Sequence, residues 1–386
     1  MNLALKDARH SPTRFILTAC GVALLMTAVI GMTGLYRGVV EDALLIIERI
    51  DADLWVVQGA RAGPFAEGSA VAADMDRRVE GVPGVADVRR FTQFSQQFSF
   101  AGATRRATIT GIDMPRDDGR WVEIAAGRWL GGGRFEAVAD ASTGLAVGDR
   151  VQLAHDVYEI VGLTRQMVDS AGDGLLFVGI NDATAIAQRR TSEEVHLARA
   201  ARGAVAVSAD ASSVAQDSKI AAVLVRLEPS AEPAEVAAAM ARWGDVRVLT
   251  LAEQRDLMLN ARLWKLRLQI LAFTGMILLI TAIVVSLIIY TMTVEKLHEI
   301  ALLKLIGARE SVVAGMIGQQ AGLIGLAGFG LALGLSRLVF PLFPRRVVMQ
   351  GSDMVLLGLA LALICAVAAW VGIARASRVS AREVLS

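Results

Sequence analysis

The sequence predicts an α-helical integral membrane protein with four transmembrane helices and a large α+β extracytoplasmic domain inserted between the first and second of them. Of its 386 residues, 54% are hydrophobic, and the net charge is +1, which is more apolar than an ordinary soluble enzyme. The apolar residues gather in four runs. The roughly 225 residues between the first two runs are polar, punctuated by glycine and alternate as strands do.

Four segments are long enough to cross a bilayer, which takes about 20 mainly apolar residues. They cover residues 15–36, 268–290, 312–335 and 354–373. Basic residues precede the first run, as they do in a signal peptide. That run is too long for a signal peptide, however, and it continues as an amphipathic helix instead of a cleavage site. We therefore interpret it as a retained span.

The predicted parts follow one another in a simple order. They are a cytoplasmic amphipathic helix over 1–14, a first transmembrane helix with an outer stalk helix over 15–50, the extracytoplasmic α+β domain over 51–250, a stalk helix and second transmembrane helix over 251–290, a cytoplasmic helix over 291–311, a third transmembrane helix over 312–335, a short outer loop over 336–353, a fourth transmembrane helix over 354–373 and a cytoplasmic tail over 374–386. The stalk helices have an alternative as short interfacial helices, with Trp264 as an anchor.

Within the large domain, several segments show local patterns. Residues 85–102 and 104–114 alternate as strands do, and 147–165 reads as a hairpin unit with turns at Gly148-Asp149 and His155-Asp156. Residues 232–250 predict a helix, a stop at Gly244 and a strand. In the strand at 85–102, the even-numbered phenylalanines at 94, 98 and 100 share one face. We expect that face to belong to the core rather than to contact lipid.

The distribution of basic residues only weakly favours one orientation of the chain in the membrane. Lys6, Arg9 and Arg14 before the first run, together with the basic residues of 291–311 and of the tail, favour cytoplasmic termini. Arginine and lysine also flank the opposite ends, at 262–267 and 337–346. We expect both termini to be cytoplasmic and the large domain to be periplasmic.

Several classes of chemistry have no motif here. There is no GxxxxGK[ST] phosphate loop, so hydrolysis of a nucleotide would need a separate chain. No charged residue lies in the four apolar cores, which disfavours a proton- or ion-driven carrier. The near-neutral net charge disfavours a nucleic-acid-binding protein, which normally has an excess or a cluster of basic residues. Cys20 and Cys365 lie in apolar runs and cannot form a disulfide framework or a CxxC metal site.

No catalytic, cofactor or metal site is predicted, because HExxH and GxSxG are absent and the four histidines are scattered. Asp169, Asp173 and Asp182, with Ser170, offer a conceivable carboxylate site. A turn-rich loop between strands is the favoured interpretation.

The third apolar run contains seven glycines. The pairs Gly318/Gly322 and Gly330/Gly334 have the spacing at which small residues let two helices approach closely in lipid. They predict a tight packing face, either against a second copy or within the chain.

The segment 291–311 lies between two apolar runs and has two different sides. Charged side chains include Glu295, Glu299 and Lys304, and apolar ones include Leu297, Ile300, Leu303 and Ile306. Such a helix could dock in a partner's groove. Alternatively, it could rest on lipid headgroups.

The stretch "EKLHEIALLKLIGARESVV" resembles the cytoplasmic coupling segment of MacB/FtsX-type ABC transporter permeases. The residues that match the family pattern are Glu299, Ile300, Leu303, Lys304, Gly307 and Ala308. The stretches "LALKDARHSPTRFILTACGVALLM", "VPGVADVRRF", "TGIDM", "AAGRWL", "AVGDRVQL", "YEIVGL" and "ASRVSAREVLS" resemble the family in the same order. The stretches "ADLWVV" and "DVRVLTLAEQRDLMLNARLW" look most like DevC-type exporter permeases.

This resemblance implies a permease subunit of a type VII, mechanotransmission-like ABC exporter that moves an amphiphile, lipid or peptide across the bacterial inner membrane. It implies a permease homodimer or close heterodimer and a separate dimeric ATPase that binds ATP and Mg. In tripartite members it also implies a periplasmic adaptor and an outer-membrane exit duct. A lipoprotein-releasing permease and an FtsX-like signal transmitter that moves no substrate are the alternatives. The expected ATPase-coupling residues are Glu295, Leu297, Glu299, Ile300, Leu303, Lys304, Ile306 and Gly307.

Overall fold

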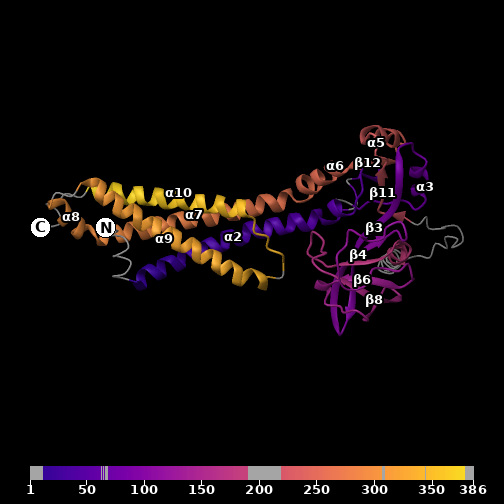
Figure 1. Ribbon diagram of the computed structural model, residues 1–386, viewed down its shortest axis with the longest axis horizontal. Coiled ribbons are helices and arrows are strands. Elements are labelled where there is room, and N and C mark those ends of the chain that lie inside the picture. The colour runs from indigo at the N-terminus through magenta and orange to yellow at the C-terminus, as the bar shows by residue number, and fades with distance from the viewer. Residues whose placement is uncertain are drawn as a thin grey trace, which may run out of the picture. The chain divides into compact units, whose positions relative to one another are not determined.

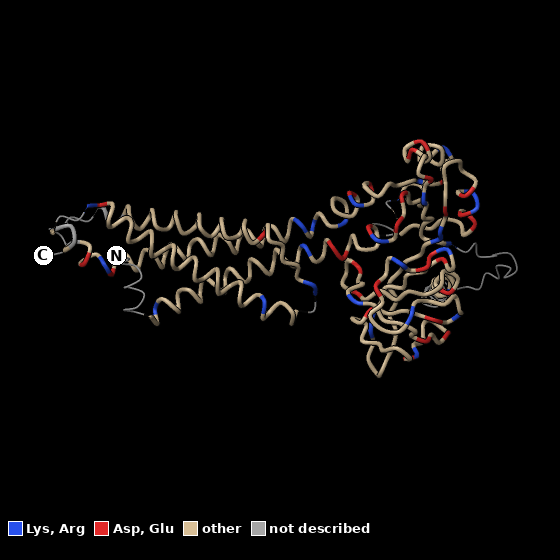
Figure 2. The backbone as a smooth tube through the Cα atoms, viewed as in Figure 1, with Lys and Arg blue, Asp and Glu red and all other residues tan. Residues whose placement is uncertain are grey.

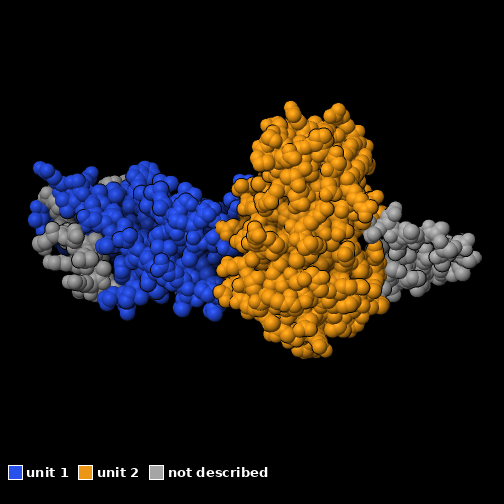
Figure 3. Space-filling view, turned by 45° about the vertical axis from the view of Figure 1, so that its right-hand side comes forward, with its two compact units in different colours: residues 1–38, 265–386 blue, residues 39–264 orange. Residues whose placement is uncertain are grey.

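The computed structural model describes residues 12–61, 63, 65, 68–189, 219–306, 309–343 and 345–378. The chain divides into two compact units (Figure 3), unit 1 with Met1–Gly38 and Lys265–Ser386 and unit 2 with Val39–Trp264. Most of the helix predicted over 1–14 and the end of the tail predicted over 374–386 lie outside the described residues.

Unit 1 is helical (Figure 1). Its elements are the first part of α2 (Pro12–Arg49), α7 (Trp264–Glu295), α8 (Leu297–Leu305), α9 (Glu310–Val339), η3 (Phe340–Leu342) and α10 (Gly351–Arg378). In the described part of the chain, α2, α7, α9 with η3, and α10 are each long and apolar enough to cross a membrane. Charged residues gather near the ends of these helices (Figure 2), and the long runs between are almost free of them.

The connection between α9 and α10 is shorter than the predicted loop over 336–353. Helix α9 ends at Val339, and Pro341 lies in the short helix η3 that follows, since a proline in the interior of an α-helix removes a hydrogen bond and clashes with the preceding turn. Helix α10 already begins at Gly351, with Asp353 in its first turn, where a carboxylate is favoured by the helix dipole.

One apolar cluster forms the core of unit 1. It combines residues of α2, α7, α9 and α10, among them Val22, Met26, Ile30, Val285, Ile289, Ile317, Ile324, Leu361 and Ala368. Large apolar side chains also cover the outside of the helices, such as Leu279, Leu326 and Leu359, which are 61%, 74% and 63% exposed. In lipid this is expected, because hydrocarbon solvates such side chains as well as a protein core does.

The two predicted stalk helices differ in their continuity. Helix α2 is a single helix of 38 residues that enters unit 2 at Val39. The second stalk, predicted as one helix over 251–290, is instead divided into α6 (Leu251–Asp256), a π-helix (Leu257–Arg262) and α7. Leu263 lies at the break with its side chain buried. A π turn widens the helix and weakens its regular hydrogen bonding, so this connection is interrupted where α2 is not.

Unit 2 contains a ten-stranded mixed sheet with the order β12-β1-β11-β3-β4-β9-β6-β8-β5, in which β7 pairs with β8. Of its ladders, β4 with β9 and β6 with β8 are parallel and the others antiparallel. The strands are β1 (Leu54–Gln58), β3 (Val85–Phe100), β4 (Ala103–Ile112), β5 (Ile124–Gly127), β6 (Glu136–Asp140), β7 (Arg150–Leu153), β8 (Asp156–Thr164), β9 (Leu175–Gly179), β11 (Ala222–Leu227) and β12 (Val246–Thr250). The short β2 (Val71–Ala72) and β10 (Lys219–Ile220) pair separately, and α3 (Met75–Glu80), η1 (Ala141–Thr143) and α5 (Pro233–Ala241) complete the named elements.

The local predictions for this domain largely agree with the structure. Strands β3 and β4 fall on the two alternating segments, and α5, Gly244 and β12 follow one another as predicted. The turn between β7 and β8 lies at Ala154-His155, one residue earlier than expected. Phe98 is buried, with Phe94 and Phe100 packed against the same cluster, which confirms that this strand face belongs to the core.

Helix α2 ends in a buried polar anchor of unit 2. The guanidinium of Arg89 on β3 donates to the carbonyl oxygens of Ile50 (2.8 Å) and Asp51 (2.6 Å), just beyond the last turn of α2. Asp117 accepts a further bond from Arg89 at 3.0 Å, and the two side chains are only 4–9% exposed. Arg89 therefore satisfies carbonyl groups that have no partner at the end of a helix.

A second ion pair in unit 2, between Glu136 and Arg128, is expected to make the stability of this unit depend on pH. The carboxylate of Glu136 accepts from the Arg128 guanidinium and from the Gly131 amide, and the hydrogen bond from Arg128 is the largest cause of the lowered pKa of Glu136. Because the folded-state pKa lies below the ordinary value of 4.5, this stabilisation is present above that pH and is lost as pH falls through the lowered pKa.

Glu136→Gln should therefore make the acid-induced loss of stability of unit 2 less steep. The measurement is the free energy of unfolding from neutral pH down to about pH 3. Exposed Glu123→Gln serves as the control. Equal acid slopes in the wild type and the Glu136→Gln variant would contradict the prediction.

Candidate functional site

The candidate site is the short helix α8, which joins two of the long helices of unit 1. Helix α7 continues to Glu295, beyond the predicted end of its span, and a turn at Lys296 leads into α8. The next helix, α9, begins at Glu310 with Arg309 as its N-cap residue. The segment 291–311 thus contains the end of α7, the helix α8 and the first two residues of α9.

The side chains of α8 that the structure describes include both a buried one and exposed ones. Ile300 is 2% exposed and belongs to the apolar cluster of unit 1, together with Met292 of α7 and Val313 of α9. On α8, Leu302 is 43% exposed and the side chain of Glu299 is also exposed, and Ile306, the residue after the helix, is 85% exposed. The helix is therefore anchored from one side and open to a partner from another.

The structure separates the predicted coupling residues. Of the expected apolar docking side, Ile300 packs inward, Leu297 is half-buried and Ile306 is uncovered. Gly307 and the side chains of Leu303 and Lys304 lie outside the part of the chain that is described.

Glu295 connects this segment to the beginning of α2. Its two carboxylate oxygens accept hydrogen bonds from the two terminal guanidinium nitrogens of Arg14, in the first turn of α2. Both side chains are about half exposed, at 49% and 46%. An exposed pair of this kind contributes little to stability. Its two hydrogen bonds nevertheless join the end of α7 to the start of α2.

The glycines of α9 divide into two groups. For Gly318, Gly322, Gly330 and Gly334, no described atom lies within 4 Å of where a side chain would begin. The close contacts are made by two others, because a Cβ at Gly325 would lie 2.7 Å from Cys365 Sγ and one at Gly328 would lie 2.7 Å from Val22. The four glycines predicted for packing are thus open in the single chain.

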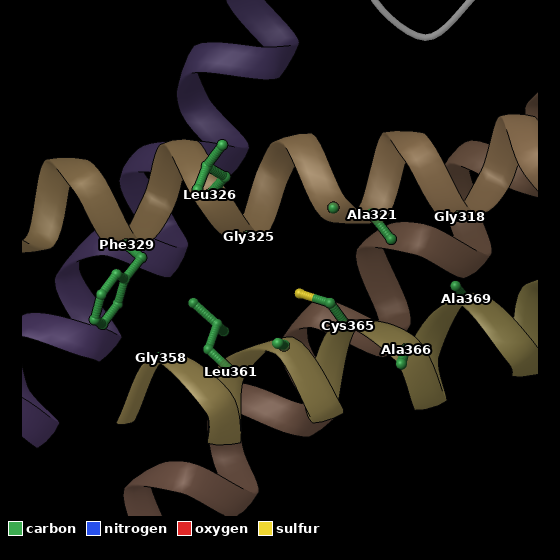
Figure 4. Close-up of a pocket in the computed structure, with 12 residues that line it drawn as sticks. Gly318, Ala321, Gly325, Leu326, Phe329, Gly358, Leu361, Cys365, Ala366 and Ala369 are labelled. Carbon is green, nitrogen blue, oxygen red and sulfur yellow. The ribbon is translucent and has the colours of Figure 1, made fainter. Parts of the chain in front are cut away.

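Two of these open glycines line an apolar groove between α9 and α10 (Figure 4). Cys365 points from α10 toward α9, and Leu326 and Phe329 come from α9. The groove has a volume of about 480 Å³, and glycine and alanine form most of its walls. It lies within the segments apolar enough to cross a membrane, and it offers no charged group to a ligand.

The carboxylates considered in the sequence have structural roles in unit 2. Asp169 accepts from Thr108 Oγ1 and from the amides of Ala171 and Asp173, which shapes a turn between β8 and β9. Asp173 pairs with Arg106, and Asp182 accepts from the Phe135 amide. Across the described ranges, no group of three or more His, Cys, Asp or Glu could hold a metal ion.

The fold and this segment first define a class: a protein with four helices apolar enough to cross a membrane, a large α+β domain and a short helix that joins two of the apolar helices. The chain belongs to the family defined by the MacB-like periplasmic core domain, whose model matches residues 15–243. Residues 271–381 match the FtsX-like permease C-terminal domain. These matches confirm the family resemblance of the sequence.

Two curated relatives are uncharacterized ABC transporter permeases from two strains of Mycobacterium tuberculosis, each 27% identical over 162 residues. These matches cover 42% of this chain and 45% of each relative, so they span less than half of the relatives' length.

Solved structures that match part of this chain include two extracytoplasmic domains. One is the extracellular domain of the noncanonic ABC-type transporter YknZ from Gram-positive bacteria, with TM-score 0.35 and 13% identity, covering 52% of this chain and 100% of that one. The other is the periplasmic region of MacB from Actinobacillus actinomycetemcomitans, with TM-score 0.37 and 10% identity, covering 54% and 93%.

Proposed function

We propose that this chain is the permease subunit of an ATP-driven ABC exporter of the mechanotransmission kind, and that α8 is where a separate ATPase subunit engages it. The observation that carries the proposal is the placement of α8, with Ile300 buried, Leu302 exposed on the same helix and Ile306 exposed directly after it. The family membership supports it, and so does the naming of the curated relatives as ABC transporter permeases.

The mechanism follows from what α8 touches. Closure of the ATPase around ATP displaces α8, and Ile300 passes this displacement to the core that α8 shares with α7 and α9. The pair of Glu295 with Arg14 passes it to the start of α2. Energy coupling of this type needs helices with two discrete packings. The glycine-lined groove between α9 and α10 supplies a surface on which such packings can differ.

ATP and Mg belong to the partner in this proposal. The chain carries no phosphate loop, and its own contribution is mechanical. We place the protein in the bacterial inner membrane with both termini and α8 in the cytoplasm and unit 2 in the periplasm. A periplasmic adaptor and an outer-membrane exit duct complete the assembly, and the cargo is an amphiphile, lipid or peptide, as in the DevC-type exporters that the sequence resembles.

A second copy of the chain is the expected partner within the membrane. Helix α7 is the least covered of the four long helices, with 17% of its most apolar window buried, against 44% for α2, 33% for α9 and 28% for α10. We propose that α7 of one copy packs against the second copy.

Cysteine crosslinking tests this dimer. In a Cys20→Ser background, Leu287→Cys on α7 should form a disulfide-linked dimer in membranes, whereas Leu359→Cys on α10 should not. The two positions are matched, because Leu287 is 59% and Leu359 63% exposed in the single chain. Crosslinking of Leu359→Cys alone would place the interface elsewhere.

Affinity purification of the full chain in mild detergent, followed by identification of its partners, tests the function as a whole. We expect an ABC ATPase to be recovered in stoichiometric amounts. Recovery of the intact chain without any ATPase would contradict the proposal.

A further inference from the structure

One face of α2 carries three glycines that meet the connection between α9 and α10. Gly31, Gly34 and Gly38 follow the spacing of one helical face. A Cβ at Gly31 would lie 3.2 Å from Phe340, and one at Gly34 would lie 2.6 Å from Val347 Cγ1. These glycines therefore differ from Gly21 of the same helix, which has nothing within 4 Å.

We call residues 345–353 the strap. Its backbone meets the backbone of α2 directly, because the Val348 amide donates to the Gly34 carbonyl oxygen at 3.0 Å. At Gly38, any side chain would overlap the Arg346 carbonyl oxygen. Contacts between two backbones leave no flexible side chain to absorb a displacement, so this junction is stiff.

An ion pair fixes the same junction in rotation. The guanidinium of Arg37 donates to both carboxylate oxygens of Asp353, in the first turn of α10, with the Nη2 to Oδ1 distance at 2.6 Å. The side chains are 32% and 13% exposed. Two parallel hydrogen bonds between planar groups hold orientation as well as distance.

From these contacts we propose that the strap is a rigid link which transmits movement of α9 and α10 to α2 during the ATP cycle. This inference rests on the proposed function and adds the route by which motion leaves the membrane helices. Helix α2 is the unbroken connection into residues 39–49, whereas the other connection is interrupted by the π-helix over Leu257–Arg262. A push along the chain therefore reaches the extracytoplasmic domain through α2.

The test uses the full chain purified with its ATPase and reconstituted in vesicles of phosphatidylethanolamine and phosphatidylglycerol. The readout is the ATP-dependent change in amide hydrogen exchange of residues 39–49 of α2. The doubly substituted Gly34→Ala/Gly38→Ala chain should reduce this change about tenfold. Alanine is a better helix former than glycine, so weakened helicity would not explain the loss. Gly21→Ala, on the open part of the same helix, should leave the change intact.

Charge exchange separates transmission from folding. Arg37→Asp and Asp353→Arg should each lose the ATP-dependent change, and the chain carrying both should recover it.

Three outcomes would overturn the inference. They are an unchanged response in the Gly34→Ala/Gly38→Ala chain, no recovery of the response in the chain that carries both Arg37→Asp and Asp353→Arg, and no ATP-dependent change in the wild-type complex. Absence of any bound ATPase would instead overturn the proposed function, and the inference with it.

Discussion

The Glu299→Ala/Leu303→Asp chain is expected to insert normally and to lose transport-coupled stimulation of its ATPase partner. Glu299 lies on the uncovered part of α8, where its carboxylate is available to a basic residue of a partner. Asp at position 303 places a charge in a segment whose apolar residues the family pattern assigns to docking. A buried charge without a partner costs several kcal/mol, which is enough to prevent a groove from closing on α8.

The measurement compares ATP hydrolysis by the reconstituted complex with that of the ATPase alone. We expect the stimulated rate to fall by about tenfold or more, the range of a typical coupling energy. Glu310→Ala, at the start of α9 and also exposed, is the control and should keep stimulation. Normal stimulation and export by the Glu299→Ala/Leu303→Asp chain would show that α8 is not the coupling element.

Removing Arg89 should give the second large effect, this time on stability. Arg89→Ala leaves the buried Asp117 carboxylate with only neutral donors, from the Trp121 indole and the Gly119 amide. It also removes a donor from the carbonyl groups at the end of α2. Breaking a buried pair from one side costs about 3–5 kcal/mol, because the remaining charge is uncompensated.

Urea unfolding of the full chain in detergent, followed by tryptophan fluorescence, measures this loss in unit 2. Arg120→Ala is the matched control, since Arg120 pairs with Asp118 while 90% exposed. An exposed pair of that kind contributes at most about 1 kcal/mol. Equal losses for the two variants would refute the assigned role of Arg89.

The sequence was most informative where a single local pattern, such as a long apolar run or strict alternation, decides the structure. Four long apolar runs have no soluble alternative, so the four long helices were predictable. Alternation in β3 and β4 gave both the strands and the core face that contains Phe98. Helix α5 was marked by Glu235 in its first turn and by Gly244, with φ of 79°, after its end.

Other features depend on which residues of other helices lie nearby, and the pattern of a single segment does not show this. The GxxxG spacing marked Gly318 and Gly322, but whether a glycine meets another helix depends on which way its face points, and the close contacts fall on Gly325 and Gly328. The amphipathic pattern of α8 gave two sides without showing that Ile300 faces the core.

Some features had no signal in the sequence. The π-helix over Leu257–Arg262 contains neither glycine nor proline to mark a break. The contacts of Arg89 join residues 38 and 39 positions apart in the chain, and their pairing follows only from the folded sheet.

The most direct test of the central claim, that a separate ATPase engages the uncovered side of α8, is site-specific photo-crosslinking in intact cells. A photoreactive amino acid replaces Ile306, which precedes α9, in one variant and Leu342, which follows α9 in η3, in another. The two positions are equally accessible in the single chain, with exposed fractions of 85% and 82%. The probe at 306 should capture an ABC ATPase, and the probe at 342 should not. Capture of no ATPase at 306, or equal capture at both positions, would contradict the account.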